Sequence, residues 1–365
     1  MRLDRSLSAY LDLLRFVAAL AVLLGHMEQD GLYMSWMPLF AFSHEAVIIF
    51  FVMSGFIIYT STLNSGRHWG DYAVARVSRV YSVALPAVIF SLFLSLTVAY
   101  ASSPTEAQLS NFRPFSLWDV SSSLLFLNEA FGNKAGLSLN GPYWSLCYEV
   151  WYYVIFGVFL FVRNNQRAFW LAAAAIVAGP AVLALFPIWI MGALLAAKWE
   201  KFPAITQRVA WAIFLGSIAV IILINASGVG TLIRVYLHDH VPGFWRLGSS
   251  QKLLTDYVTG IAVVLHIVAF SSLNAGFKAF FLRFEKIFKY LAGFSFTLYL
   301  FHRPLTQLAG YYMPNTEASI VRSLFVLFAI LLMCVIISYG TERRLGFWRA
   351  FLAKRFGLAA GSRVV

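Results

Sequence analysis

Apolar stretches close to twenty residues long recur along the whole of this 365-residue chain. They lie near 10–27, 41–62, 80–101, 143–162, 168–183, 186–197, 209–226, 253–272, 288–311 and 319–340. A helix of about twenty apolar residues is what the hydrocarbon core of a bilayer requires. Charged residues make up only 12% of the chain, against about a quarter of a soluble domain. The sequence therefore predicts an all-α, polytopic membrane bundle of about ten transmembrane helices.

The net charge of +12 is distributed in a way that points to membrane topology. The basic residues fall between apolar runs, whereas a nucleic-acid site gathers them on a polar surface, so no nucleic-acid partner is expected. Most of them lie near the termini and in the connections 63–79, 163–167, 198–208 and 273–287. Because cytoplasmic loops are enriched in Lys and Arg, both termini are predicted to be cytoplasmic.

The remaining segments complete the predicted organisation. The fifth and sixth runs are short and are broken by Gly179, Pro180 and Pro187, which indicates a tight hairpin. The connections 102–142 and 227–252 are expected to face outward, with an interfacial apolar patch at 123–127 that is too short to span. Residues 1–345 are predicted to form the membrane domain and 346–365 a basic cytoplasmic tail.

Two ionisable residues, Arg15 and His26, lie in the first apolar run. Eleven residues make about three helical turns, so both side chains share one face and lie about 16 Å apart along the axis. Asp12, one turn before Arg15, is a plausible ion-pair partner. Charges inside spans are costly and are functional candidates. In the alternative interpretation, Asp12 and Arg15 anchor the helix at the interface and His26 caps its outer end.

A second group of polar residues begins the fourth run. Ser145, Glu149 and Tyr152 follow one another at helical spacing, just after Asn140 and Trp144. Glu149 lies about two turns inside the helix without a Lys or Arg nearby in sequence, so it needs a cationic partner from another helix or must stay protonated. An interhelical ion pair and a catalytic role are both open for it.

Other polar residues recur in or beside the apolar runs. Arg76 and Arg79, spaced i and i+3, have the geometry to converge on phosphates, although ordinary cytoplasmic positive charge explains them equally. His302 lies in the ninth run before Pro304 and is expected to be buried. Ser54 interrupts the second run beside Gly55, which permits close helix packing. The cluster His238, Asp239 and His240 lacks a distant fourth ligand, so no metal site is predicted.

These motifs together resemble the acyltransferase 3 family of membrane-bound acyltransferases, which includes O-antigen and exopolysaccharide acetylases. The resemblance covers about residues 9–341. It rests on Leu11-Asp-Leu-Leu-Arg15 with His26, Phe50-Phe-Val-Met-Ser-Gly-Phe56, Arg76-x-x-Arg79, Trp144-Ser-Leu-x-x-Glu149 with Tyr152-Tyr153, and Ser295-x-x-Leu-Tyr-Leu-Phe-His302. The chain departs from the family pattern at Phe16, where glycine is common, and at Ser82, where proline is frequent.

The resemblance implies a multi-pass protein of the bacterial inner (cytoplasmic) membrane that transfers an acyl group, usually acetyl, from cytoplasmic acyl-CoA to an envelope carbohydrate. It implies no permanently bound cofactor, with acetyl-CoA as co-substrate. By that resemblance His26 and Glu149 are catalytic, and Arg15, Arg76 and Arg79 bind acyl-CoA.

Substrate-binding or structural roles are expected for a further set of residues: Trp144, Ser145, Tyr152, Asn140, Ser54 and His302. A proton-coupled transporter or flippase of a sugar or lipid is the rival hypothesis, since carriers also bury ionisable residues. No inverted repeat of the kind common in carriers is visible in the sequence.

Overall fold

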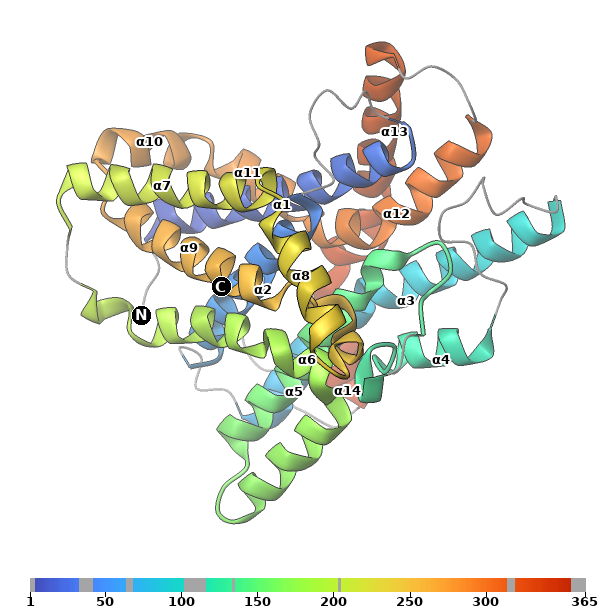
Figure 1. The fold of residues 1–365 in the computed structure, drawn as a ribbon, viewed down its shortest axis with the longest axis horizontal. Coiled ribbons are helices and arrows are strands. Elements are labelled where there is room, and N and C mark those ends of the chain that lie inside the picture. The colour runs from blue at the N-terminus through green and yellow to red at the C-terminus, as the bar shows by residue number, and fades with distance from the viewer. Residues whose placement is uncertain are drawn as a thin grey trace. The chain divides into compact units, whose positions relative to one another are not determined.

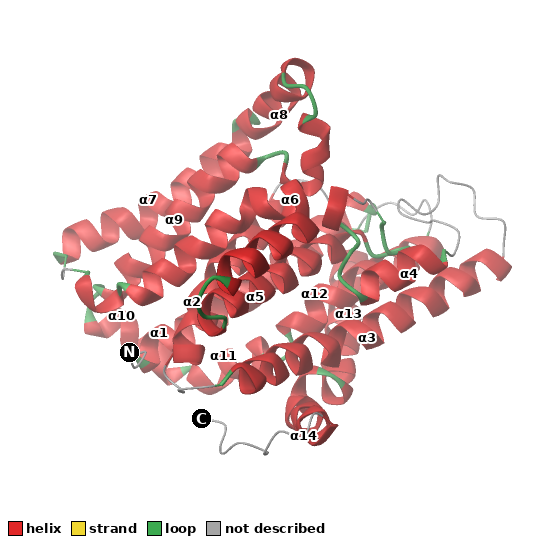
Figure 2. Ribbon diagram, turned by 90° about the horizontal axis from the view of Figure 1, so that it is seen from below, coloured by secondary structure: helices red, strands yellow, loops and turns green. Residues whose placement is uncertain are grey.

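The computed structural model describes residues 4–32, 42–63, 68–101, 116–132, 135–202, 205–313 and 319–355. Within these ranges the regular elements are helices, without a strand (Figure 2). Much of the outer connection predicted at 102–142, and the end of the basic tail from 356 onward, lie outside the described residues.

The α-helices are, in chain order, α1 (Arg5–Gln29), α2 (Ser43–Leu63), α3 (Trp69–Ala101), α4 (Leu117–Leu124), α5 (Trp144–Phe161), α6 (Gln166–Ala197), α7 (Gln207–Ala226), α8 (Val229–His240), α9 (Leu253–Ser271), α10 (Ala275–Arg283), α11 (Glu285–Ala292), α12 (Ser295–Tyr312), α13 (Ile320–Gly340) and α14 (Leu345–Arg355). Short 3-10 turns join them at η2 (Ala130–Gly132), η3 (Gly141–Tyr143), η4 (Trp199–Lys201), η5 (Phe244–Ser250) and η6 (Glu342–Arg344).

Eight helical segments of the described chain are long and apolar enough to cross a membrane. They are Arg5–Gln29, Ser43–Leu63, Trp69–Ala99, Gly141–Phe161, Gln166–Ala197, Gln207–Ala226, Phe244–Ser271 and Ile320–Arg355. An all-α membrane protein with several spans is thereby confirmed. The predicted count of ten differs from these eight in two places, α6 and α12.

The fifth and sixth predicted spans form the single run α6. Gly179 interrupts it with φ 78° and ψ 172°, a conformation that glycine adopts without steric cost, and Pro180 follows. The run therefore consists of two helical stretches that meet at the residues where the sequence predicted a break.

The ninth predicted span divides into α11 and α12, with Gly293 and Phe294 between them. Its second part, α12, is too polar to count as a candidate span. Five of the polar residues of α12 are buried: Thr297, His302, Arg303, Thr306 and Gln307. They are shielded by protein, so their polarity says little about what the outside of α12 faces.

The third span was predicted to begin near residue 80, after a connection at 63–79 that carries the arginine motif near the helix start, and this boundary was wrong. Helix α3 begins at Trp69, so Arg76 and Arg79 lie inside it, two to three turns from its start. The connection 227–252, which was predicted to face outward, contains α8 and η5. The cluster His238, Asp239 and His240 is exposed on α8. The patch at 123–127 lies at the end of the short helix α4, consistent with its not being a span.

By its internal contacts the chain divides into two compact units. The first comprises the described residues of Met1–Val22, Ala41–Ser65 and Pro180–Ala292. Here α7 packs along α9, and α9 packs on α2 (Figure 1). Two glycines bring α2 against the second stretch of α6: a Cβ on Gly55 would lie 2.0 Å from the Trp189 carbonyl oxygen, and one on Gly192 would lie 1.9 Å from that of Val52. Gly55 therefore permits close helix packing, as the sequence predicted.

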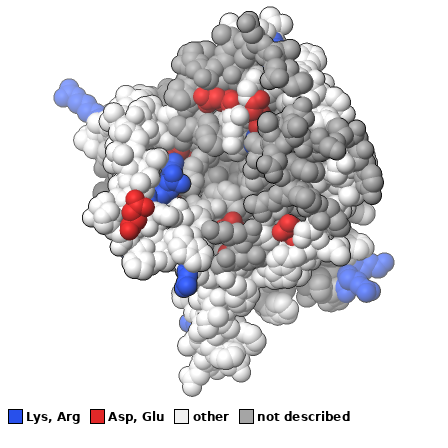
Figure 3. Space-filling view, turned by 45° about the vertical axis from the view of Figure 1, so that its right-hand side comes forward, with Lys and Arg blue, Asp and Glu red and all other residues white. Residues whose placement is uncertain are grey.

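The second unit comprises the described residues of Leu23–Phe40, Gly66–Gly179 and Gly293–Val365. Helix α12 packs on both α13 and α3, and α3 also contacts α4, α5 and α14. The end of α1, from Leu23 onward, belongs to this unit. On the face drawn in Figure 3 the described surface is mostly uncharged, with only scattered basic and acidic side chains.

Candidate functional site

The second unit brings His26, at the end of α1, against His302 in the middle of α12. His302 Nε2 lies 3.3 Å from His26 Nδ1, and the ring centroids are 5.0 Å apart. His302 is fully buried, whereas His26 is partly buried. The two predicted site histidines, 276 residues apart in sequence, therefore form one pair.

The hydrogen bonds of His302 define which ring nitrogen carries its proton. Its Nδ1 lies 2.7 Å from the carbonyl oxygen of Tyr299 and 3.2 Å from that of Leu298. A carbonyl can only accept, so Nδ1 donates and Nε2 of the neutral ring is the acceptor. His26 Nδ1 must then donate to it, which leaves the lone pair of His26 on Nε2.

A buried ion pair lies beside these histidines. Arg303 is fully buried, and its Nη1 lies 2.5 Å from Asp30 Oδ2. Gln307 donates through Nε2 to Asp30 Oδ1 at 2.7 Å. Asp30 follows His26 by four residues and Gln307 follows Arg303 by four, so each pair lies on one side of its own segment. The end of α1 is thereby fixed to α12.

A second connection joins α12 to the start of α5. Pro304 has no N–H, so the carbonyl of Leu300, four residues earlier, lacks its helical donor. Asn140 fills that place, donating through Nδ2 to the Leu300 oxygen at 2.9 Å. The predicted site residue Asn140 thus repairs the helix that carries His302.

Tyr299 links Ser145, near the start of α5, to the histidine pair. Its hydroxyl lies 2.7 Å from Ser145 Oγ and donates to the Pro142 carbonyl at 3.1 Å. Its own carbonyl is the acceptor for His302 Nδ1. Ser145 therefore acts as a structural partner of α12 in this arrangement.

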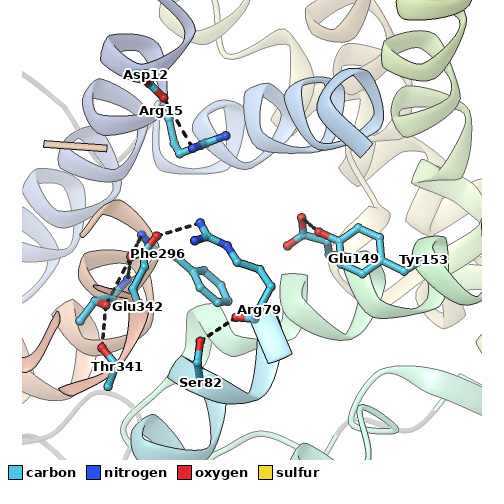
Figure 4. Close-up of polar contacts among 10 residues, drawn as sticks. Asp12, Arg15, Arg79, Ser82, Glu149, Tyr153, Phe296, Thr341 and Glu342 are labelled. Carbon is cyan, nitrogen blue, oxygen red and sulfur yellow. Dashed lines mark hydrogen bonds and ion pairs between the residues drawn. The ribbon is translucent and has the colours of Figure 1, made fainter. Parts of the chain in front are cut away.

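Glu149 and Arg76 are connected through Tyr153. The Tyr153 hydroxyl donates to the Glu149 carboxylate, one turn away on α5 (Figure 4). The guanidinium carbon of Arg76 lies 5.8 Å from the centre of the Tyr153 ring and 6.0 Å from that of Tyr72. Cations are attracted to aromatic faces at such distances.

Arg79 turns to a different neighbour. Its Nη2 lies 2.8 Å from Glu342 Oε1, and its guanidinium carbon lies 5.5 Å from the centre of the Phe296 ring. The other oxygen of Glu342 accepts from the backbone N–H groups of Phe296 and Thr297, each at 3.1 Å (Figure 4). Glu342 thus caps the N-terminus of α12, where a negative charge is favourable, and Arg79 balances that charge. The two arginines of the motif do not converge within the described contacts.

Two of the predicted site residues belong to the first unit. Arg15 Nη1 lies 3.8 Å from Asp12 Oδ1, which confirms the predicted partner (Figure 4). Ser54 accepts a hydrogen bond from Trp189 Nε1 at 3.2 Å, beside the Gly55 crossing. Both lie on helices that are candidate spans.

The remaining predicted residues, Trp144 and Tyr152, pack on Tyr148 from either side in α5. Their ring centroids lie 5.0 and 6.3 Å from that of Tyr148. Tyr152 is fully buried and Trp144 is partly buried. Tyr152 is therefore a core residue, and of the two only Trp144 keeps an accessible surface.

Four members of this site were not predicted from the sequence: Asp30, Arg303, Gln307 and Glu342. A signal was present for the first three: a carboxylate one turn beyond His26, and a cation and an amide spaced i and i+4 beside His302. No comparable signal marked Glu342, because it stands directly before Arg343 and Arg344 and resembles an ordinary surface charge.

Comparison with known proteins gives one positive result. No curated protein and no solved structure matches the chain. The model of the acyltransferase 3 family, described as an acyltransferase domain, matches residues 8–339. That range includes the histidine pair, the buried Asp30–Arg303 pair and both arginines of α3. The chain is therefore a multi-pass membrane protein that belongs to the acyltransferase 3 family, whose members transfer an acyl group from a donor.

Proposed function

We propose that the protein transfers an acyl group, acetyl by preference, from acyl-CoA to a hydroxyl of a cell-envelope polysaccharide or lipid-linked sugar. The observation that carries this proposal is the His26–His302 pair, which leaves a basic ring nitrogen on His26 within a matched acyltransferase domain. An imidazole titrates near neutral pH, which suits proton transfer from a hydroxyl.

His26 acts through Nε2. In one course it takes the proton of the acceptor hydroxyl while that oxygen attacks the thioester carbonyl, the C–S bond breaks, and the departing CoA thiolate is protonated. In the other course Nε2 itself attacks the thioester carbonyl, the C–S bond breaks, and CoA leaves as a thiolate. The acceptor oxygen then attacks the acyl-imidazole, the N–acyl bond breaks, and the hydroxyl proton passes to the thiolate, which restores His26 and completes the ester. His302 serves both courses because it keeps the Nδ1 proton of His26 in place.

Glu149 is assigned to the acceptor. His302 supplies the orienting contact of His26. A carboxylate held by a tyrosine hydroxyl has further lone pairs with which to accept hydrogen bonds from sugar hydroxyls. Trp144, partly exposed near the start of α5, offers an aromatic face for the same sugar.

The donor is assigned to the arginines. Arg79 has five N–H donors and uses one group on Glu342, so it has capacity for a phosphate of coenzyme A. Arg15, expected near the cytoplasmic half of α1, is assigned to the thioester end.

The full proposal includes topology. Both termini are cytoplasmic and α12 is one of ten crossings, in the inner membrane of a bacterium. The support is the distribution of basic residues and the buried polarity of α12. Single-cysteine labelling from either side of sealed vesicles, starting from a chain without Cys147 and Cys334, tests each connection.

The test of the function is thioester cleavage by purified protein with acceptor supplied. His26→Ala should lower the rate by about 10²–10⁴-fold, the usual contribution of an acid–base group. His240→Ala, at an exposed histidine of α8, is the matched control and should keep the wild-type rate. Full activity of a folded His26→Ala variant would remove His26 from the chemistry. Failure of the wild type to consume any acyl-CoA would point instead to a carrier.

A further inference from the structure

A cavity of about 450 Å³ lies between α3 and α5 in the second unit. Its volume is within the range of small-molecule sites. Its lining side chains are apolar apart from Arg76, three tyrosine hydroxyls and the indole N–H of Trp69. None of the functions assigned above uses this space.

The walls of the cavity are held in place by specific contacts. Tyr72 donates from its hydroxyl to the Tyr153 carbonyl at 2.8 Å, and Gly157 leaves room for the Tyr72 ring, since a Cβ there would lie 2.9 Å from it. Phe126 closes part of the cavity from a left-handed backbone conformation, φ 54°. The carbonyl of Phe126 accepts hydrogen bonds from Trp151 Nε1 at 2.9 Å and from the Cys147 thiol. A left-handed backbone conformation is costly for a bulky residue, so these contacts hold Phe126 in place.

The cavity opens through apolar side chains on both helices. Val77 of α3 is 37% exposed and Val154 of α5 is 40% exposed, and both line it. Both helices are candidate spans, and the cavity lies between the first turns of α3 and the last turns of α5, so its apolar opening is near one end of both spans. An aliphatic chain can therefore enter sideways from the bilayer.

Arg76 gives the cavity one fixed charge. Its guanidinium lies over the Tyr72 and Tyr153 rings, which line the same cavity. An arginine presents donors in a fork that matches phosphate oxygens. The Arg76 guanidinium and the apolar wall of the cavity therefore lie within a few ångströms of each other.

We propose that this cavity is a binding site for an anionic phospholipid, with one acyl chain between α3 and α5 and the phosphate on Arg76. In a phospholipid only the glycerol separates the phosphate from the chain, which matches the short separation here. In an acyl-CoA the chain is attached at the far end of the pantetheine arm from the phosphates. Arg76 then binds a lipid, whereas it was predicted from the sequence to bind the donor. Arg79 remains with the donor.

Native mass spectrometry of the full chain, released from detergent and titrated with phosphatidylglycerol or phosphatidylcholine of the same chains, tests this site. The wild type should retain one phosphatidylglycerol in preference to phosphatidylcholine. Val77→Trp and Val154→Trp, from opposite walls, should each lower that occupancy by about tenfold. Arg76→Gln should remove the preference between the two headgroups.

Matched controls separate the cavity from general effects. Ile89→Trp places the same bulk on an exposed part of α3 outside the cavity, and Arg163→Gln removes an exposed charge just beyond α5. Both should bind as the wild type does. Each variant is first shown to be monodisperse and helical, and two tryptophan variants guard against one that fails to fold.

Three results would overturn the proposal. Wild-type phosphatidylglycerol occupancy in both folded tryptophan variants would show that the chain lies elsewhere. A preserved headgroup preference in Arg76→Gln would remove the phosphate contact. Loss of palmitoyl-CoA binding in the tryptophan variants, with phosphatidylglycerol retained, would assign the cavity to the donor's own chain. None of these outcomes depends on acyltransferase activity, so the proposed function stands or falls separately.

Discussion

Two regions of the second unit differ in how their charged residues are paired. They are the histidine cluster (His26, His302, Asp30, Arg303 and Gln307) and the arginine motif (Arg76 and Arg79). At the histidines, Asp30, Arg303 and Gln307 neutralise and hydrogen-bond one another in a nearly dry environment. On α3, Arg76 and Arg79 lie one turn apart and turn to different neighbours, one to a cavity and one to Glu342. Removing one member of a buried ion pair leaves the other charge uncompensated, which destabilises the fold. A partly exposed arginine can still donate hydrogen bonds to a ligand. The first region should therefore respond to mutation through folding, and the second through binding.

Removing one member of the buried ion pair should have the largest effect. Asp30→Ala leaves the fully buried Arg303 without its carboxylate, and should lower the free energy of unfolding by about 3–5 kcal/mol. The measurement is reversible unfolding in mixed micelles. The double variant Asp30→Ala/Arg303→Met removes both charges and should recover much of the loss. If the double variant is no more stable than Asp30→Ala, the pair is not what holds α1 to α12.

Replacing His302 tests whether the histidine cluster also serves chemistry. His302→Leu removes the acceptor for the Nδ1 proton of His26 and should lower the acyl-transfer rate by about 10–100-fold, as loss of an orienting partner does. His302→Gln retains an acceptor oxygen at a similar reach and should recover part of the rate. The pH profile of the rate is the second readout. Equal rates and profiles for Leu and Gln would show that His302 only fills space.

Asn140→Ala should affect stability less. It leaves the Leu300 carbonyl without a donor beside Pro304, and an unsatisfied buried acceptor costs about 1–3 kcal/mol. The free energy of unfolding is again the measurement. The informative control is Asn140→Ala in a chain that also carries Pro304→Ala, where the helix can supply its own N–H. If Asn140→Ala costs the same in both backgrounds, the proline has no part in the role of Asn140.

Arg79→Gln should have the smallest effect and should show itself in donor binding. We expect KM for acetyl-CoA to rise by about tenfold, with kcat changed less, because one phosphate contact is lost. The substitution also unpairs Glu342, so Arg79→Gln/Glu342→Gln is measured beside it. A KM that returns to the wild-type value in the double variant would show that Arg79 acts only through Glu342. Arg76→Gln should leave acetyl-CoA binding unchanged in lipid-free detergent.

The fold was largely predictable because the bilayer imposes a length and a polarity on each helix. The break at Gly179 and the close approach at Gly55 were also readable, since glycine and proline restrict the backbone directly. The start of α3 was misplaced because charge was taken as the sign of a loop. Within a bundle, Arg79 is acceptable inside a helix once Glu342 faces it.

The residues of the candidate site were easier to predict than their partners. Arg15, His26, Glu149 and His302 stand out because polarity in an apolar run is conspicuous. Tertiary packing decides which of these residues contact one another, and it leaves no periodic pattern in the sequence. For that reason the contact of His26 with His302, and the separate neighbours of Arg76 and Arg79, could not be deduced from spacing.

The acceptors of the His302 Nδ1 proton are main-chain carbonyls, at positions 298 and 299. They are present whatever side chains occupy those positions, so genetic variation there cannot withdraw them while α12 remains a helix. The tautomer of His302 therefore depends on the helical backbone of α12 and not on the side chains at positions 298 and 299. Sequence drift around the site can alter what surrounds the imidazoles, but the donor role of His302 Nδ1 and the acceptor role of its Nε2 are kept while α12 stays helical.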